Sequence, residues 1–89
     1  MITIYKYKLG GQQNSIELPL GSEVLTMQLQ NGEPHIWVKL DDQVIRTETH
    51  VFNVVGTGWG LDEIGKYIGT YQTPNMFVFH VFHEEPKNN

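Results

Sequence analysis

Apolar and polar residues alternate along short segments of the chain, and turn-forming residues separate these segments. The clearest segment is 23–30, in which Leu25, Met27 and Leu29 are each followed by a polar residue. A period of two is typical of a strand with one buried face. Asn31-Gly32 follows directly, and this dipeptide is the strongest short signal for a β-hairpin. We therefore expect residues 23–30 to form the first strand of a hairpin.

The same pattern predicts strands along most of the remaining chain. Residues 35–40 are the partner strand of the hairpin, with the apolar even-numbered residues facing the core. Further strands are expected at 1–9, 15–18, 47–55, 67–72 and 76–82. The last of these is apolar on both faces apart from His80, so we expect a central strand that the domain or another subunit covers on both sides. Residues 61–65 have the composition of one helical turn.

The predicted fold is all-β and mainly antiparallel: a small sandwich or partly open barrel with at most one short helical turn. Residues 1–83 form a single β-rich domain, and residues 84–89 form a solvated C-terminal tail. A chain of 89 residues buries only about 60–65% of its unfolded surface. No cysteine is present, so disulfides cannot add stability. The chain can then be stabilised by very regular packing or by self-association. We favour self-association and expect a homo-oligomer, a dimer or tetramer.

The charge balance narrows the classes of partner. The chain has six Lys and Arg residues and ten Asp and Glu residues, and its net charge is −4. This negative charge argues against binding of polymeric nucleic acid. A small ligand with one or two phosphates remains compatible, because backbone N–H groups can bind anions. The longest apolar run is too short to span a membrane, and the first residues lack the pattern of a signal peptide. We expect a cytoplasmic protein that does not bind membranes.

The residues that could carry catalysis do not form a recognisable constellation. His80 and His83 are three residues apart in an extended segment, so their rings lie on opposite faces and cannot share a metal ion. Ser15 and Ser22 lack the G-x-S-x-G context of a nucleophile, and there is no cysteine nucleophile. The sequence therefore predicts that the protein is not an enzyme and uses no metal ion or cofactor.

A glycine-rich segment, Gly56-Thr57-Gly58-Trp59-Gly60, follows the strand at 47–55. Glycine allows the backbone to approach a ligand closely, consecutive N–H groups can form a nest for an anion, and Thr57 adds a donor. Trp59 offers a flat face on which a nucleobase can stack. The alternative is a tight strand connection whose tryptophan covers the edge of the core. The motif is not the dinucleotide fingerprint, because no βαβ unit surrounds it.

Two cations are candidates to counter the charge of a bound phosphate. Lys6 lies between two tyrosines, and the Arg46 guanidinium has the bidentate geometry that phosphates favour. The alternative is that both side chains are simply solvated. Ligand-binding residues are thus predicted to be Lys6, Arg46, Gly56, Thr57, Gly58 and Trp59. Exposed aromatic residues in the predicted strands (Tyr5, Tyr7, Trp37, Tyr67 and Tyr71) indicate a subunit interface.

Blocks spread over the chain carry a resemblance to a known group of proteins. The blocks include Ile4-Tyr5-Lys6-Tyr7, Gln28-Leu29-Gln30-Asn31-Gly32, Val55-Gly56-Thr57-Gly58, Tyr67-Ile68-Gly69-Thr70 and Phe79-His80-Val81-Phe82. On these blocks the chain resembles a family of small phage proteins of uncharacterised-domain type. One departure matters: the family usually has histidine and proline soon after Gly-Thr-Gly, whereas this chain has Trp59-Gly60. The resemblance therefore carries no ligand role to the last position of the loop.

The family looks like the phage sponges of anti-CBASS immune evasion, small oligomers that bind cyclic dinucleotide signals without cleaving them. This resemblance implies a viral protein that sequesters a cyclic dinucleotide in the cytoplasm of the infected bacterial host. The alternative is an interaction module that binds a host or phage protein without binding any nucleotide. A nucleotide hydrolase would need a metal site or a paired acid and base, which the sequence does not offer.

Overall fold

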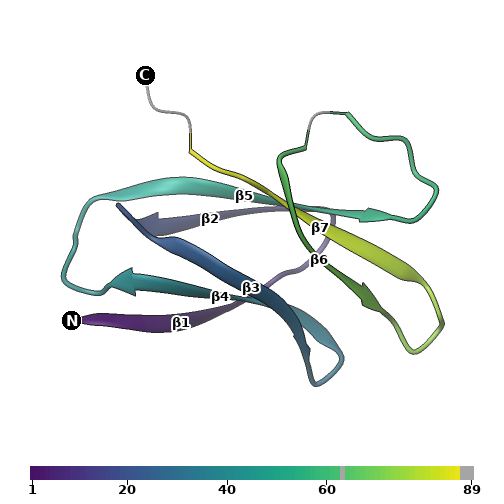
Figure 1. Ribbon diagram of the computed structural model, residues 1–89, viewed down its shortest axis with the longest axis horizontal. Coiled ribbons are helices and arrows are strands. Elements are labelled where there is room, and N and C mark those ends of the chain that lie inside the picture. The colour runs from purple at the N-terminus through teal and green to yellow at the C-terminus, as the bar shows by residue number, and fades with distance from the viewer. Residues whose placement is uncertain (63, 87–89) are drawn as a thin grey trace.

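The computed structural model describes residues 1–62 and 64–86, which form seven antiparallel strands in two sheets (Figure 1). The strands are β1 (Ile2–Lys8), β2 (Gln13–Pro19), β3 (Glu23–Gln30), β4 (Glu33–Asp41), β5 (Thr47–Gly56), β6 (Lys66–Gln72) and β7 (Val78–Glu84). One sheet has the order β1-β4-β3 and the other has the order β2-β5-β7-β6. The all-β prediction is confirmed, and of its two alternatives the sandwich is correct. In the described part of the chain, no helix has the length and apolar character needed to cross a membrane.

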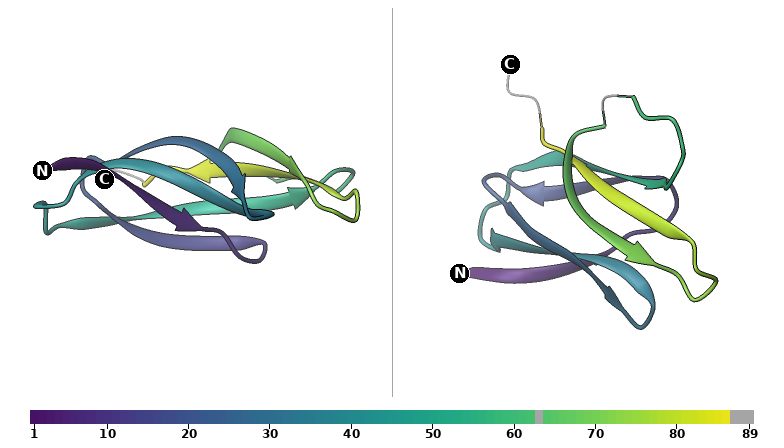
Figure 2. Two further views of the ribbon diagram at one scale, coloured as in Figure 1. Left: turned by 90° about the horizontal axis from the view of Figure 1, so that it is seen from below. Right: turned by 45° about the vertical axis from the view of Figure 1, so that its right-hand side comes forward.

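The two sheets pack face to face as a flat sandwich of 40 × 32 × 16 Å (Figure 2). Contacts between β3 and β6 and between β4 and β2 join the layers. Buried apolar side chains from both sheets fill the space between them: Leu9, Leu18, Met27, Ile36, Val38, Leu40, Phe52, Val54 and Val81. The even-numbered residues of β4 therefore face the core as predicted, because alternate side chains of a strand point to the same side.

The hairpin between β3 and β4 turns at Asn31-Gly32, as the sequence predicted. Asn31 and Gly32 have φ angles of 53° and 75°. Positive φ at both central residues defines the turn whose twist matches that of the flanking strands. The turn sets Gln30 opposite Glu33, so this dipeptide fixes the pairing of β3 with β4 next to the turn.

The predicted inward face of residues 23–30 is wrong in part. Met27 is buried, but Leu25 and Leu29 are 43% and 40% exposed. A β-bulge interrupts the pairing of β3 with β4 between Val24 and Thr26, so Leu25 has no partner in the ladder. The extra residue shifts the alternation, and Val24 packs on the core in place of Leu25. Leu29 lies near the end of the strand, where the other sheet does not cover it fully.

Strand β7 is central, as predicted, because it pairs with β5 on one side and β6 on the other. It continues beyond the predicted end at Phe82 to Glu84. We expected β7 to be covered on both faces. Within the described part of the chain, only its inner face is covered. Val81 and His83 on the inner face are buried, whereas His80 and Phe82 on the outer face are half-buried.

The predicted helical turn at 61–65 does not form in the residues that the structure describes there. Leu61, Asp62, Ile64 and Gly65 are not helical, and Glu63 lies outside the described residues. Gly65 has φ +98°, a left-handed value that a right-handed helical turn cannot contain. The predicted tail at 84–89 is described only as far as residue 86, so residues 87–89 lie outside the described part.

Candidate functional site

The Gly56–Gly60 loop is a tight turn at the end of β5. The N–H of Trp59 donates to the carbonyl of Gly56 at 3.1 Å, and the N–H of Thr57 donates to the carbonyl of Val78 at 3.0 Å. These two donors are therefore occupied within the chain. A ligand anion would have to use other N–H groups of the loop, or displace these hydrogen bonds.

The Thr57 hydroxyl belongs to a chain of hydrogen bonds on the outer face of the four-stranded sheet. It lies 3.2 Å from the carbonyl of Val78 and 2.7 Å from Nε2 of His80. Nδ1 of His80 lies 2.9 Å from the Thr70 hydroxyl, which lies 2.6 Å from the hydroxyl of Tyr67. Because a carbonyl can only accept, Thr57 donates to Val78 and therefore accepts from the N–H at Nε2 of His80. His80 and Thr57 thereby fasten the loop to β7.

The Trp59 side chain folds back over Gly56 and half covers the edge of the core. A Cβ atom on Gly56 would lie 2.7 Å from Cε2 of the indole. The indole also meets the Phe79 ring edge to face, with centroids 6.1 Å apart. Trp59 is nevertheless 46% exposed. One part of the indole thus packs on Gly56 and Phe79, while the rest of its surface remains open to a partner.

An apolar groove lies beside Trp59. It has a volume of about 440 Å³ and is lined by Gly56, Thr57, Trp59, Met76, Phe77, Val78 and Phe79. Met76 and Phe77 on its rim are 77% and 64% exposed. A smaller hollow of about 290 Å³, which Leu61, His80 and Phe82 help to line, also borders Trp59. We call the larger hollow the Trp59 groove. Its lining suits a flat apolar group such as an aromatic ring.

The two cations predicted as ligand residues do not reach this groove within one chain. Arg46 immediately precedes β5, and the loop begins at the other end of that ten-residue strand, which places them about 30 Å apart. Lys6 lies on β1 in the other sheet, and its ammonium group donates to Oε1 of Gln30 at 2.5 Å. The structure thus brings Gly56, Thr57, Gly58 and Trp59 together and leaves Lys6 and Arg46 apart from them.

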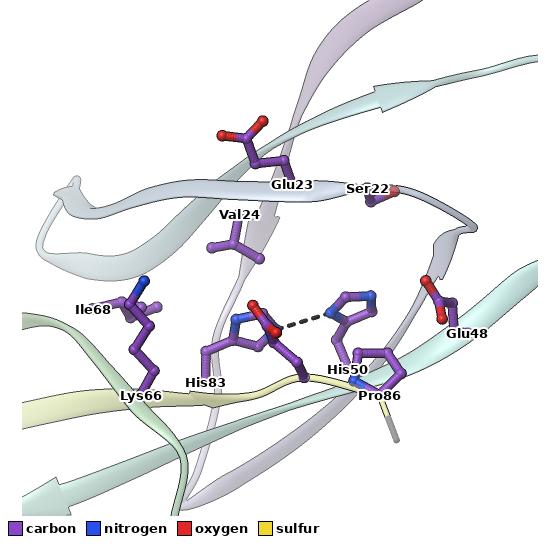
Figure 3. A pocket seen from close by; sticks show the side chains of 10 residues that line it. Ser22, Glu23, Val24, Glu48, His50, Lys66, Ile68, His83 and Pro86 are labelled. Carbon is purple, nitrogen blue, oxygen red and sulfur yellow. Dashed lines mark hydrogen bonds between the residues drawn. The ribbon is translucent and has the colours of Figure 1, made fainter. Parts of the chain in front are cut away.

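A pair of buried histidines forms a second polar centre, which sequence reasoning missed (Figure 3). Nδ1 of His50 lies 2.8 Å from Nε2 of His83, and the two rings stack with centroids 5.1 Å apart. The His83 ring also stacks on Phe52, at 4.7 Å. Their positions, 33 residues apart, gave no local motif. The available signal was an inward-facing histidine on each of two neighbouring strands.

Burial lowers the pKa of both histidines. For His50, desolvation outweighs the opposite effect of Glu48, Glu85 and Glu17 on its pKa. For His83, desolvation and the neighbouring His50 both lower the pKa. The pair is therefore neutral at pH 7. The described residues contain no group of three or more His, Cys, Asp or Glu side chains arranged to hold a metal ion.

Nε2 of His50 is buried and has no hydrogen-bond partner within the described part of the chain. A buried polar atom left in this way costs about 1–3 kcal/mol. His50 lines a pocket of about 370 Å³ at the start of β5. The pocket also contains His83 and opens between the ends of β3, β5, β6 and β7. We call it the histidine pocket.

The comparison with known proteins concerns the whole chain, which includes the Trp59 groove and the histidine pocket. A family model described as a domain of unknown function (DUF7352) matches residues 1–89. The chain belongs to this family. No curated protein and no solved structure matched it. Membership of DUF7352 assigns no activity to the chain.

In this DUF7352 chain, Gly56→Ala is expected to displace the indole of Trp59. The new methyl group would overlap the ring, and the ring can swing away because it is a side chain on an exposed loop. We expect a red shift of tryptophan emission that is absent from Gly60→Ala, since nothing lies within 4 Å of a Cβ at position 60. The emission of Trp37 provides a constant background in both variants. Identical spectra for the two variants would show that the indole does not rest on Gly56.

Proposed function

We propose that this chain is a non-enzymatic binding protein of phage origin that sequesters a cyclic dinucleotide during immune evasion. The observation that carries the proposal is the Trp59 groove, which joins an exposed indole to an apolar floor next to a glycine backbone. Stacking of a nucleobase on an aromatic side chain contributes about 1–3 kcal/mol per base. Glycine at position 58, where nothing lies within 4 Å of a Cβ, leaves room for a ligand to approach the backbone.

The phosphates of such a ligand need a cation that the groove of one subunit lacks. Arg46 and Lys6 are too far from Trp59 in the same chain, so a second subunit has to supply one of them. The proposal therefore requires a homo-oligomer, a dimer or tetramer, with the ligand between subunits. Sequestration then works by mass action in the cytoplasm of the infected host, because a tight binder present above the concentration of the signal lowers the free ligand.

The decisive experiment screens the purified protein against a panel of cyclic dinucleotides by thermal shift. A ligand that binds only the folded state raises the melting temperature, by an amount that grows with its concentration. The complex is then heat-denatured and the released ligand is analysed by chromatography. Recovery of intact ligand supports the proposal, whereas linear products would identify a hydrolase. The absence of any shift across the panel would overturn the proposal.

Two variants test which part of the loop binds. Trp59→Ala is expected to weaken binding about 10-fold or more, as the loss of one stacked base predicts. Thr57→Val is expected to weaken binding less, because the Thr57 hydroxyl already bonds to Val78 and His80. Leu25→Ala is the matched control, since Leu25 is 43% exposed and lies outside the loop. If neither loop variant changes the ligand affinity measured by calorimetry, the loop has a structural role only.

A second candidate function is an interaction module that binds a host or phage protein. The observation that favours it is an exposed apolar cluster. Trp59 is 46% exposed, and three large apolar side chains around it are exposed as well: Leu61 at 56%, Phe77 at 64% and Met76 at 77%. Exposed apolar clusters of this kind often mark protein contacts. This function predicts no nucleotide shift, together with a stoichiometric protein complex that Phe77→Ser disrupts.

A further inference from the structure

The histidine pocket lies away from the Trp59 groove and needs its own explanation. His50 precedes Gly56 by six positions on β5, which separates the two centres by about 20 Å. Nothing in the proposed function uses the pocket. Its volume of about 370 Å³ is within the range of small-molecule sites.

Within the residues that the structure describes, the buried histidine pair presents a free nitrogen, Nε2 of His50. Each neutral imidazole has one N–H and one lone pair, and the contact between Nδ1 of His50 and Nε2 of His83 uses one of each. When His50 donates in that contact, its Nε2 becomes an acceptor. This atom is the one left without a partner in the described part of the chain, on a residue that is only 3% exposed. Figure 3 shows the ring standing in the pocket, with its free edge turned away from His83.

The charged side chains around the pocket are mostly acidic. Three carboxylates, those of Glu23, Glu48 and Glu85, line it together with one ammonium group, that of Lys66. Because the histidine pair is neutral at pH 7, the pocket carries a negative balance. The Ser22 hydroxyl, which also lines the pocket, donates its proton to a backbone carbonyl at 2.6 Å and therefore offers a ligand an oxygen that accepts.

We propose that the histidine pocket binds a small organic cation that carries a primary amine or guanidinium group. The N–H donors of such a group match the carboxylates that line the pocket. In the tautomer in which His50 donates from Nδ1, they also match its unpaired Nε2. An anion would meet three carboxylates. A metal ion would lack a group of three suitable side chains among the described residues, and the facing histidine nitrogens already bond to each other.

The test follows the histidine ring C–H signals by NMR at pH 7.5 and low salt during a titration with agmatine, which carries both an amine and a guanidinium group. We expect saturable shifts of the His50 and His83 signals, with the His35 and His80 signals unchanged. Sodium chloride at matched ionic strength is the control for simple screening. Shifts no larger than those with sodium chloride would overturn the proposal, as would a response to phosphate in place of agmatine.

Charge-neutral variants locate the site in the intact protein. Glu48→Gln and Glu85→Gln each remove one carboxylate, and each is expected to weaken agmatine binding about 3-fold or more. The amide that replaces the Glu48 carboxylate keeps an oxygen, which can still accept from the N–H of Gly21. Glu33→Gln removes the same charge from an exposed residue outside the pocket and is expected to leave the affinity unchanged. If all three variants lost the same amount of agmatine affinity, the effect would come from net charge alone. That result would contradict a defined site.

Discussion

Replacing Gly65 by alanine is expected to destabilise the protein by about 3 kcal/mol or more, through left-handed backbone strain and overpacking together. Gly65 has φ +98°, and a Cβ there would lie 2.4 Å from the carbonyl oxygen of His83. That neighbour is backbone of the central strand β7, so it cannot move aside as a side chain can. In a domain of this size we expect the melting temperature to fall by about 12 °C or more.

Two other glycines separate the causes of that loss. Gly21 also has a positive φ, +86°, but nothing lies within 4 Å of a Cβ there, so Gly21→Ala reports strain alone. Gly10 has neither a positive φ nor a close neighbour, so Gly10→Ala is expected to be neutral within about 0.5 kcal/mol. Thermal and urea denaturation of the three variants should rank them Gly65, Gly21, Gly10 in order of loss. A Gly65 variant no less stable than the Gly21 variant would show that β6 can move away from β7.

The close approach at Gly65 explains how the chain returns from the loop to the sheet. The Asn53 side chain on β5 donates to the carbonyl of Ile64 at 3.0 Å and to the carboxylate of Glu84 at 2.9 Å. These bonds draw the chain onto the sheet directly before β6 begins. A substitution at Gly65 therefore disturbs the start of β6 and the end of β7 together, and with them one wall of the histidine pocket.

Local sequence signals predicted the features that depend on neighbouring residues. Asn31-Gly32 determines its turn through positive φ angles at two adjacent residues. The apolar run around Val81 indicates a central strand because an edge position would leave it in water. The bulge at Leu25 was not predictable in this way, since it depends on how β3 meets β4 and leaves the composition of the strand unchanged.

Features that depend on distant segments were the ones that the sequence did not reveal. The partnership of His50 and His83 arises because β5 and β7 are neighbours with Phe52 opposite His83. The hydrogen bond between Thr57 and His80 likewise joins the loop to a distant strand. The bond that the Thr57 hydroxyl donates to the carbonyl of Val78 changes this hydroxyl from a free donor to an occupied one. The sequence located the loop correctly, but its internal hydrogen bonds were visible only in three dimensions.

Acidification from pH 7 to pH 5 is expected to destabilise the fold through the histidine pair. Burial lowers the pKa of His50 and His83 below the ordinary value of 6.5. Below pH 6.5 the unfolded chain therefore binds protons that the folded chain does not, and the free energy of unfolding decreases as the pH falls. The slope is at most about 1.4 kcal/mol per pH unit for each histidine. We expect the melting temperature to fall as the pH decreases through this range.

The carboxyl groups titrate at lower pH. The change in stability between pH 7 and pH 5 therefore reports the histidines. Hydrogen bonds from Thr49 and Thr47 lower the pKa of Glu17, and their contribution to stability is lost only below its ordinary value of 4.5. Melting curves between pH 7 and pH 5 measure the effect, and NMR titration of the histidine ring signals measures the two pKa values without any substitution. Because protonation of one ring opposes protonation of the other at 2.8 Å, the pair should titrate as a unit. A stability that is constant from pH 7 to pH 5, or two histidines that titrate at 6.5, would show that water reaches the pair freely, and the histidine pocket would then lose the buried acceptor on which its ligand depends.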